Sequence, residues 1–267
     1  MLLRLLSALA RVRMTATYAV IVTCVTFALL RLGPREHDRV VQHASTNLHN
    51  LSHGHILTLL GSAFVIDSGP VYVWLPGLVC LLAVAELMWR SWRLIVAFAV
   101  GHIGATLLVA IGLTAAVAMR WLPVSVTRAT DVGMSYGAAG ALGSLTAAIP
   151  RRWRPAWTGW WLAVAVVVVA LGRDFTDVGH AVALVLGMAV STRFGRPAPW
   201  TPVRVLMLAV ATTFGYLMLA NNPLALMVST GAGLLSAVVF QRARTYAAHP
   251  RDFWAISPRS APSCDRL

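Results

Sequence analysis

The chain has 267 residues, of which 58% are hydrophobic and only 12% charged, and its mean hydropathy is +0.72. A soluble domain of this length could not bury so much apolar surface, so a soluble enzyme and a disordered tail are both excluded. The formal charge of +13 comes from 22 basic residues, all arginine, which lie between apolar segments and not on one soluble face, so no nucleic-acid binding is expected.

Eight apolar segments approach the roughly 20 residues that a helix needs to cross a bilayer, and they predict an all-α polytopic membrane protein. In chain order the predicted spans are 16–33, 71–89, 94–118, 133–149, 155–172, 178–194, 204–220 and 223–240. The first span follows several arginines and shows no small-residue cleavage site before Arg31, which predicts a retained anchor.

The remaining segments are predicted to stay outside the hydrocarbon core or to enter it only partly. Residues 1–15 form a cytoplasmic N-terminus, and 34–54 form an outer loop rich in His and Asn. The apolar block 55–67 has 13 residues, too few to cross as a helix, so we expect a half-depth element. Residues 241–267, rich in Arg, Pro and Ser, predict a disordered cytoplasmic tail.

The arginines predict the orientation of the spans. With the N-terminus inside and the block 55–67 not crossing, 16 of the 22 arginines fall in inner connectors and six in outer ones. The positive-inside rule therefore favours eight crossings of the plasma membrane with both termini cytoplasmic. A crossing by 55–67 would reverse that ratio.

A repeated tetrapeptide draws attention to two residues. Thr-Asp-Val-Gly occurs at 130–133 and 176–179, in front of the fourth and sixth spans, where we expect it to cap both helices at the same outer level. Ser135 and His180 follow closely and are therefore expected at similar depth. A serine nucleophile needs a base within hydrogen-bond reach, so the two predict a Ser-His dyad. Because Glu86 is the only acid inside a predicted span, no buried carboxylate is expected beside this dyad.

Small residues around both candidates favour close packing of the fourth and sixth spans. They are Gly133, Gly137, Gly140, Ala141 and Gly143 on the former, and Ala183 and Gly187 on the latter. Such residues also serve packing alone, and a histidine near a helix end can simply be hydrated, so a purely structural role stays open.

Other histidines carry weaker signals. His102 lies in mid-span between two glycines. It can have a functional role or simply form a hydrogen bond between helices, and the sequence leaves both possibilities open. His49, His53 and His55 form an outer cluster without diagnostic ligand spacing or an accompanying acid. The sequence therefore predicts no metal and no cofactor.

These residues resemble the rhomboid family of intramembrane serine proteases, and in particular a divergent, actinobacterial-type rhomboid-like group. Gly133-Met134-Ser135 with Gly140 and Gly143 is similar to the run that carries the family's nucleophile, and His180 with its small neighbours is similar to the last core helix. The resemblance implies a six-helix core over 16–195, with two additional C-terminal helices over 204–240.

The resemblance also implies site roles. Ser135 would be the nucleophile and His180 the base, while His55 matches the histidine that helps to bind the oxyanion. Glu86 resembles the acid at the end of the core helix that, in the family, begins with this histidine. The sequence departs from the family pattern at Tyr136, where the family has glycine, and at Leu59, where it has asparagine.

Two functions follow as hypotheses. One is a serine endopeptidase that cleaves transmembrane segments through the Ser-His dyad. The alternative is a catalytically inactive rhomboid-like protein that binds the transmembrane helices of client proteins. The expected partners are membrane lipid and transmembrane helices of clients or substrates. A transporter is less favoured, because no pair of broken helices in inverted repeats is evident.

Overall fold

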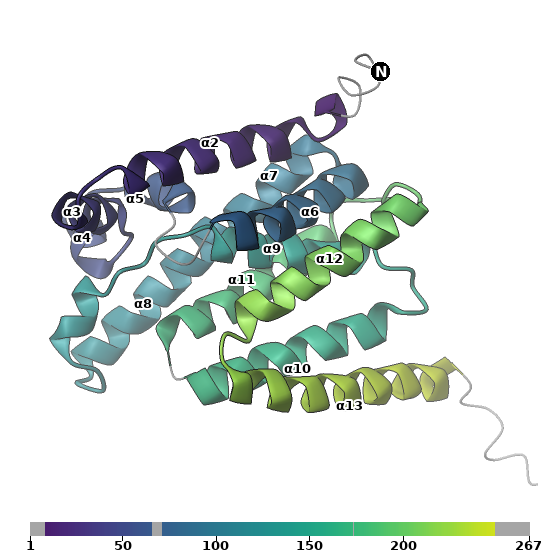
Figure 1. Cartoon of the computed structure of the whole chain (residues 1–267). Coiled ribbons are helices and arrows are strands. Elements are labelled where there is room, and N and C mark those ends of the chain that lie inside the picture. The colour runs from purple at the N-terminus through teal and green to yellow at the C-terminus, as the bar shows by residue number, and fades with distance from the viewer. Residues whose placement is uncertain (1–8, 66–70, 173, 249–267) are drawn as a thin grey trace, which may run out of the picture.

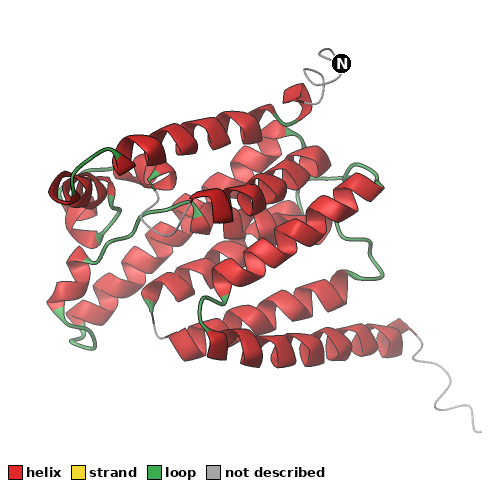
Figure 2. Cartoon of the chain, in the orientation of Figure 1, coloured by secondary structure: helices red, strands yellow, loops and turns green. Residues whose placement is uncertain are grey.

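The computed structural model describes residues 9–65, 71–172 and 174–248, and within these ranges the chain forms helices and connectors without a strand (Figures 1 and 2). The residues outside these ranges are 1–8 of the predicted N-terminal segment, 66–70 at the end of the predicted half-depth block, Arg173, and 249–267 of the predicted tail. The predicted all-α class is confirmed for the described part of the chain.

Six of the described helices are long and apolar enough to cross a membrane. They are α2 (Arg13–Leu30), α6 (Val71–Trp89), the continuous helix from α7 (Ser91–Ala99) through a π-helical turn (Val100–Gly104) into α8 (Ala105–Ala118), α10 (Arg154–Gly172), α12 (Pro202–Leu219) and α13 (Pro223–Ala248). The chain is therefore a multi-pass membrane protein. Helix α13 continues to Ala248, so the first residues of the predicted tail are helical.

The fourth and sixth predicted spans correspond to shorter helices. Helix α9 (Ser135–Ser144) has 10 residues and continues into a 3₁₀ turn (Leu145–Ala147), and α11 (Phe175–Ser191) has 17. By length and composition the described residues therefore contain six candidate membrane-spanning helices, and crossing by α9 and α11 stays a prediction.

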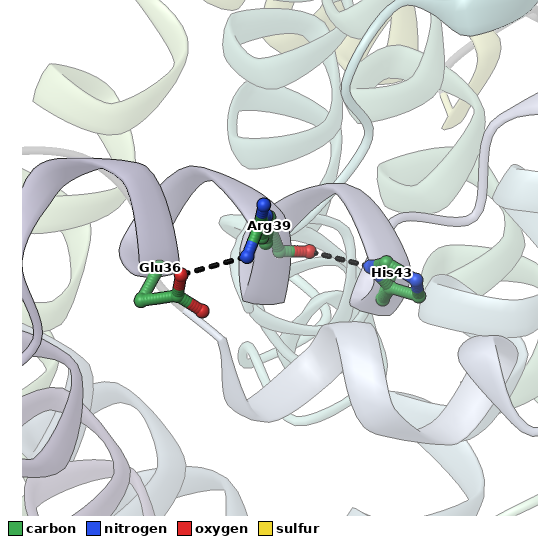
Figure 3. Close-up of polar contacts among 3 residues, drawn as sticks. All are labelled: Glu36, Arg39 and His43. Atoms are coloured by element: carbon green, nitrogen blue, oxygen red, sulfur yellow. Dashed lines mark hydrogen bonds and ion pairs between the residues drawn. The ribbon is translucent and has the colours of Figure 1, made fainter.

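The predicted outer loop contains two helices, α3 (Pro34–Ala44) and α4 (Leu48–Ser52). Figure 3 shows polar contacts among three exposed residues of α3: Arg39 pairs with Glu36 at 2.8 Å, and the carbonyl of Arg39 lies 2.7 Å from Nδ1 of His43. The block 55–67 forms only α5 (Thr58–Gly61) and a 3₁₀ turn (Ser62–Phe64) in its described part. These turns are too short to cross, as predicted, and their depth stays a prediction.

Helix α9 lies at the centre of the bundle, and every residue from Tyr136 to Ser144 is buried. Glycines allow the approach, since a Cβ at Gly187 of α11 would lie 2.0 Å from the carbonyl oxygen of Gly140. A Cβ at Gly101, in the π-helical turn, would lie 2.7 Å from the Cα of Gly140. The predicted close packing of these helices is confirmed.

The two C-terminal helices pack on different parts of the bundle. Helix α12 packs against α6, where Gly77 makes room for the ring of Phe214. Helix α13 runs alongside α10, where Gly159 makes room for Phe240 (Figure 1). Both helices are therefore integral parts of the bundle.

The predicted caps are wrong for both helices. The N-cap of α11 is Asp174, whose carboxylate accepts from the N–H of Thr176 at 3.2 Å. The N-cap of α9 is Met134, which makes no side-chain cap bond. Asp131 is instead fixed by the outer loop: its N–H donates to Ser45 Oγ at 2.8 Å, and its carbonyl accepts from the N–H of Thr46 at 3.0 Å.

Candidate functional site

Ser135 is the first residue of α9 and is half-buried. The chain approaches it through Gly133, whose φ of 124° suits glycine and whose N–H donates to the carbonyl of Ser62 at 2.9 Å. The amides of the first helical turn have no carbonyl partners within the helix, so the start of α9 can supply hydrogen-bond donors to an anion.

His180 lies in the second turn of α11 and is 8% exposed. Both of its ring nitrogens are buried without a hydrogen-bond partner among the described residues. Its ring contacts Tyr136 edge to face, with centroids 5.2 Å apart and an angle of 81°. The structure thus brings His180 to the first turn of α9, but no hydrogen bond joins His180 to Ser135.

Tyr136 fills the space between the starts of α9 and α11. It is 2% exposed, and its hydroxyl has no hydrogen-bond partner of normal geometry among the described residues. A Cβ at Gly179 would lie 2.3 Å from that hydroxyl oxygen, so only glycine leaves room for it. The departure from the family pattern at Tyr136 therefore has a matching glycine on the facing helix.

Acidic side chains gather around this tyrosine. Asp131, Asp174 and Asp177 all act electrostatically on its hydroxyl. Burial raises the pKa of Asp131 to about 6, and the negative charge of Asp174 adds a smaller rise. The hydroxyls of Thr46 and Tyr136 act in the opposite direction and lower this pKa.

The helix that carries His180 contains a buried acid that the sequence analysis did not expect. Asp177 is 3% exposed, and its Oδ1 has no partner among the described residues. Helix α11 begins at Phe175, three residues before the predicted span, because Asp174 caps it. Asp177 therefore lies within the helix, three residues before His180.

Glu86 joins helices at the far end of α6. Its carboxylate is 1% exposed and accepts from the N–H of Met14 at 3.0 Å, the N–H of Thr15 at 2.9 Å and the hydroxyl of Ser91 at 2.6 Å. The hydroxyl of Thr15 also donates to it at 2.7 Å. Glu86 thereby satisfies amides at the start of α2 and holds α2, α6 and α7 together.

His55 lies in the turn between α4 and α5 and is exposed. Its N–H donates to the carbonyl of Asn50 at 3.0 Å, and no hydrogen bond joins it to Ser135. Its role at the oxyanion stays a prediction. Nearby on α4, the rings of His49 and His53 lie 4.3 Å apart, and among the described residues no group of three His, Cys, Asp or Glu could hold a metal ion.

The structure contains a serine-histidine pair that the sequence analysis did not identify. Ser62 Oγ and His102 Nε2 lie 3.1 Å apart, and both residues are buried. His102 belongs to the π-helical turn, a local irregularity that often marks a functional position. The sequence left a hydrogen bond between helices open for His102, but no spacing rule points to a partner 40 residues away.

A comparison with protein families places this arrangement in context. The family model described as Rhomboid-like protein matches residues 10–198, which extend from α2 through α11 and include both Ser135 and His180. Helices α12 and α13 lie beyond the matched residues. No curated protein and no solved structure matches the chain. Because the match covers well over half of the chain, this protein belongs to the Rhomboid-like protein family.

Proposed function

We propose that this protein is a rhomboid-type intramembrane serine protease. The observation that carries the proposal is the imidazole of His180, which is buried against the first turn of α9 and has no hydrogen-bond partner for either nitrogen among the residues that the structure describes. Such a group is costly in a native protein and calls for an explanation, of which a catalytic role is one. A catalytic hydrogen bond that is absent without substrate can form in the complex.

In the proposed reaction Ser135 attacks the carbonyl carbon of a peptide bond in or next to a transmembrane segment. His180 takes the proton from the hydroxyl of Ser135 and passes it to the leaving amine. Water then hydrolyses the acyl-enzyme, with His180 again acting as base. The backbone amide of Ser135, at the start of α9, and the side chain of His55 would stabilise the oxyanion.

A second function is favoured by a different contact. Tyr136 packs on the ring of His180, and no hydrogen bond joins that ring to Ser135. A tyrosine that keeps the imidazole away from the serine would suit a catalytically inactive protein that binds the transmembrane helices of clients. The glycine-lined packing of α9 and α11 would then be structural.

Labelling with a serine-directed fluorophosphonate distinguishes the two functions. In a bilayer, the wild-type protein should be labelled at Ser135, and both Ser135→Ala and His180→Ala should abolish the labelling while the protein stays folded. Dependence on His180 is the informative result, because an unactivated hydroxyl is a weak nucleophile.

His43→Ala is the matched control, because His43 is an exposed histidine on α3. It should leave labelling unchanged. Labelling that survives His180→Ala would reject the dyad. Absence of labelling in the folded wild-type protein would favour the helix-binding function.

A further inference from the structure

A pocket of about 610 Å³ lies at the end of the bundle where α9 ends and α10 begins. One side is formed by residues 146–151, in the connector between these two helices. The other side is formed by the end of α11 and by residues 195–200, which lead to α12. Ser135 lies at the opposite end of α9, so this pocket is separate from the proposed protease chemistry.

The wall of the pocket is fixed by hydrogen bonds to backbone carbonyls. Nη2 of Arg154 donates to the carbonyl of Ala147 at 2.6 Å and to that of Ile149 at 3.1 Å. From the other side, Nε1 of Trp200 donates to the carbonyl of Ala148 at 3.1 Å. The first two bonds hold the connector that follows α9, and the third joins the two sides. A ligand would therefore meet a preformed site.

The charged side chains of this pocket are arginines without a counter-ion. Arg151 and Arg196 line the pocket and are exposed, and neither side chain makes an ion pair or a hydrogen bond with the described residues. The charges of Arg151 and Arg244 also act on the guanidinium group of Arg154, so like charges gather here. No described acidic residue lines the pocket. An anion would relieve this repulsion, and the planar guanidinium group matches the oxygens of a phosphate.

The pocket lies at the level where a bilayer changes from hydrocarbon to headgroups. Arg154 is the first residue of a candidate span, and α12, another candidate span, begins at Pro202, two residues after the pocket wall ends. Trp153 is 55% exposed, and Trp200 lines the pocket. Tryptophan prefers the membrane interface. An anion bound here would therefore lie at the depth of the lipid phosphates.

An aromatic groove of about 360 Å³ lies next to this pocket, between the candidate spans α10 and α12 (Figure 1). It is lined by Trp157, Trp160, Trp161, Thr212, Thr213 and Tyr216. Trp157 connects the two sites, because its Nε1 donates at 3.1 Å to the hydroxyl of Thr146, which lines the arginine pocket. Trp157 and Trp161 lie roughly 5 and 10 Å along α10 from Arg154, at 1.5 Å per residue. An acyl chain whose phosphate lies at the arginines can reach this groove.

We propose that this end of the bundle binds one anionic diacyl phospholipid. Its phosphate lies between Arg151 and Arg196, and one of its acyl chains lies in the aromatic groove between α10 and α12. Basic pockets between membrane helices are a recurrent form of anionic lipid recognition. A soluble phosphate compound would neutralise the arginines but leave the groove empty, so a membrane lipid fits both sites better.

Native mass spectrometry of the full-length protein in detergent tests this site. The protein is titrated with phosphatidylglycerol and, separately, with phosphatidylcholine of the same acyl chains, and the Kd of the first bound lipid is measured. We expect phosphatidylglycerol to bind about tenfold more tightly or better, because the trimethylammonium group of phosphatidylcholine brings a further positive charge to the arginines.

Two double variants remove the same charge from the same two connectors. Arg151→Gln with Arg196→Gln should raise the Kd for phosphatidylglycerol by about tenfold or more, as expected for lost hydrogen bonds between charged groups. Arg152→Gln with Arg193→Gln is the matched control, because both arginines are exposed and lie outside the pocket wall. This control should change the Kd by less than about threefold. Equal losses in both double variants would overturn the proposal, because net charge alone would then attract the lipid.

A second pair of variants tests the aromatic groove. Thr213 is exposed and lines the groove, so Thr213→Phe should raise the Kd for phosphatidylglycerol by about fivefold, as expected when one to two methylene groups are displaced. Val210→Phe, on the same helix but outside the groove wall, should leave the Kd unchanged. Thermal unfolding of each variant verifies that it is folded.

The wild-type protein alone can also contradict the proposal. Equal affinity for phosphatidylcholine would show that the arginines do not select an anionic lipid. Displacement of phosphatidylglycerol by an equal concentration of glycerol 3-phosphate would show that the ligand is a soluble phosphate compound and that the groove contributes nothing.

Discussion

Among single side chains, Tyr136 has the largest influence on the geometry of the candidate site. It belongs to a small buried cluster with Ala105, Ala139 and Ala183, and it also contacts His180. Its ring therefore contributes to packing, whereas its hydroxyl has no partner of normal geometry among the described residues. The two parts of this side chain can be tested separately.

Replacing Tyr136 should separate the effect of the ring from that of the hydroxyl. Tyr136→Phe keeps the ring and removes a buried hydroxyl that has no partner of normal geometry in the described part of the chain, so it should stabilise the protein by about 1 kcal/mol or leave it unchanged, with fluorophosphonate labelling as in the wild type. Tyr136→Gly should lower stability by roughly 3 to 5 kcal/mol but raise labelling if the ring restrains His180. Labelling of a folded Tyr136→Gly protein below the wild-type level would contradict that restraint.

Asp131 should make stability depend on pH. Burial raises its pKa from 3.8 to about 6, so the folded protein binds this proton more tightly than the unfolded chain. Stability should consequently fall as the pH rises from about 4 to 6. Asp131→Asn removes this dependence. The difference between the unfolding midpoints of the variant and the wild type should therefore increase in favour of the variant from about pH 4 to 6 and level off at higher pH. A constant difference from pH 4 to 7 would contradict the assignment.

Among the elements, α9 depends most on close contact between backbones. It is short and fully buried beyond Ser135, and glycines of two neighbouring elements face it. Gly187 on α11 and Gly101 in the π-helical turn both approach Gly140, so a side chain at any of these three positions would meet backbone atoms that cannot rotate away. The relative position of Ser135 and His180 is therefore set by glycine contacts deeper in the bundle.

Gly187→Ala should open this interface. The new methyl group would lie 2.0 Å from the carbonyl oxygen of Gly140, so α9 and α11 must separate, at a cost of about 1 to 3 kcal/mol in unfolding free energy. Any His180-dependent labelling of Ser135 should also fall. Gly231→Ala on α13 is the matched control, because nothing lies within 4 Å of its Cβ. Equal stability of the two variants would show that the interface can relax.

Apolar length and small-residue spacing predicted the long helices and the glycine contact between α9 and α11. They did not predict how short α9 is, because the apolar run 133–149 includes two connector residues before the helix and a 3₁₀ turn after it. The caps were also mispredicted, since Asp131 is fixed by Ser45 and Thr46 from a distant segment. The pairing of Ser62 with His102 likewise depends on tertiary contact, which no local pattern encodes.

At the scale of the whole molecule, hydrogen bonds join the connectors into two groups. One group contains predicted inner connectors and the inner ends of predicted spans, joined by Ala198 to Met88, Trp200 to Ala148, Gln241 to Arg152 and Arg244 to Arg151. The other contains predicted outer segments, joined by Thr46 to Asp131, Gln42 to Thr130 and Gly133 to Ser62. No bond in either set mixes an inner connector with an outer one, so these contacts agree with the grouping that the arginine count predicts.

The orientation of these two groups can be tested by cysteine accessibility in intact cells, in a background without the native cysteines. Cysteines at Arg128 and Asn222 should react with a membrane-impermeant maleimide from outside, whereas cysteines at Arg152 and Arg244 should react only after permeabilisation. The expectation follows from the excess of arginine in the inner connectors, which the positive-inside rule places in the cytoplasm.

Arg152 and Arg244 form an internal control. The carbonyl of Arg152 accepts from Gln241, and Arg244 donates to the carbonyl of Arg151, so the two cysteines must report the same side of the membrane. If both reacted from outside, the orientation would be reversed and Ser135 would face the cytoplasmic half of the bilayer. Such a result would leave the bundle intact, but it would move any substrate cleavage site to the cytoplasmic side, because the start of α9 lies with the opposite group of connectors.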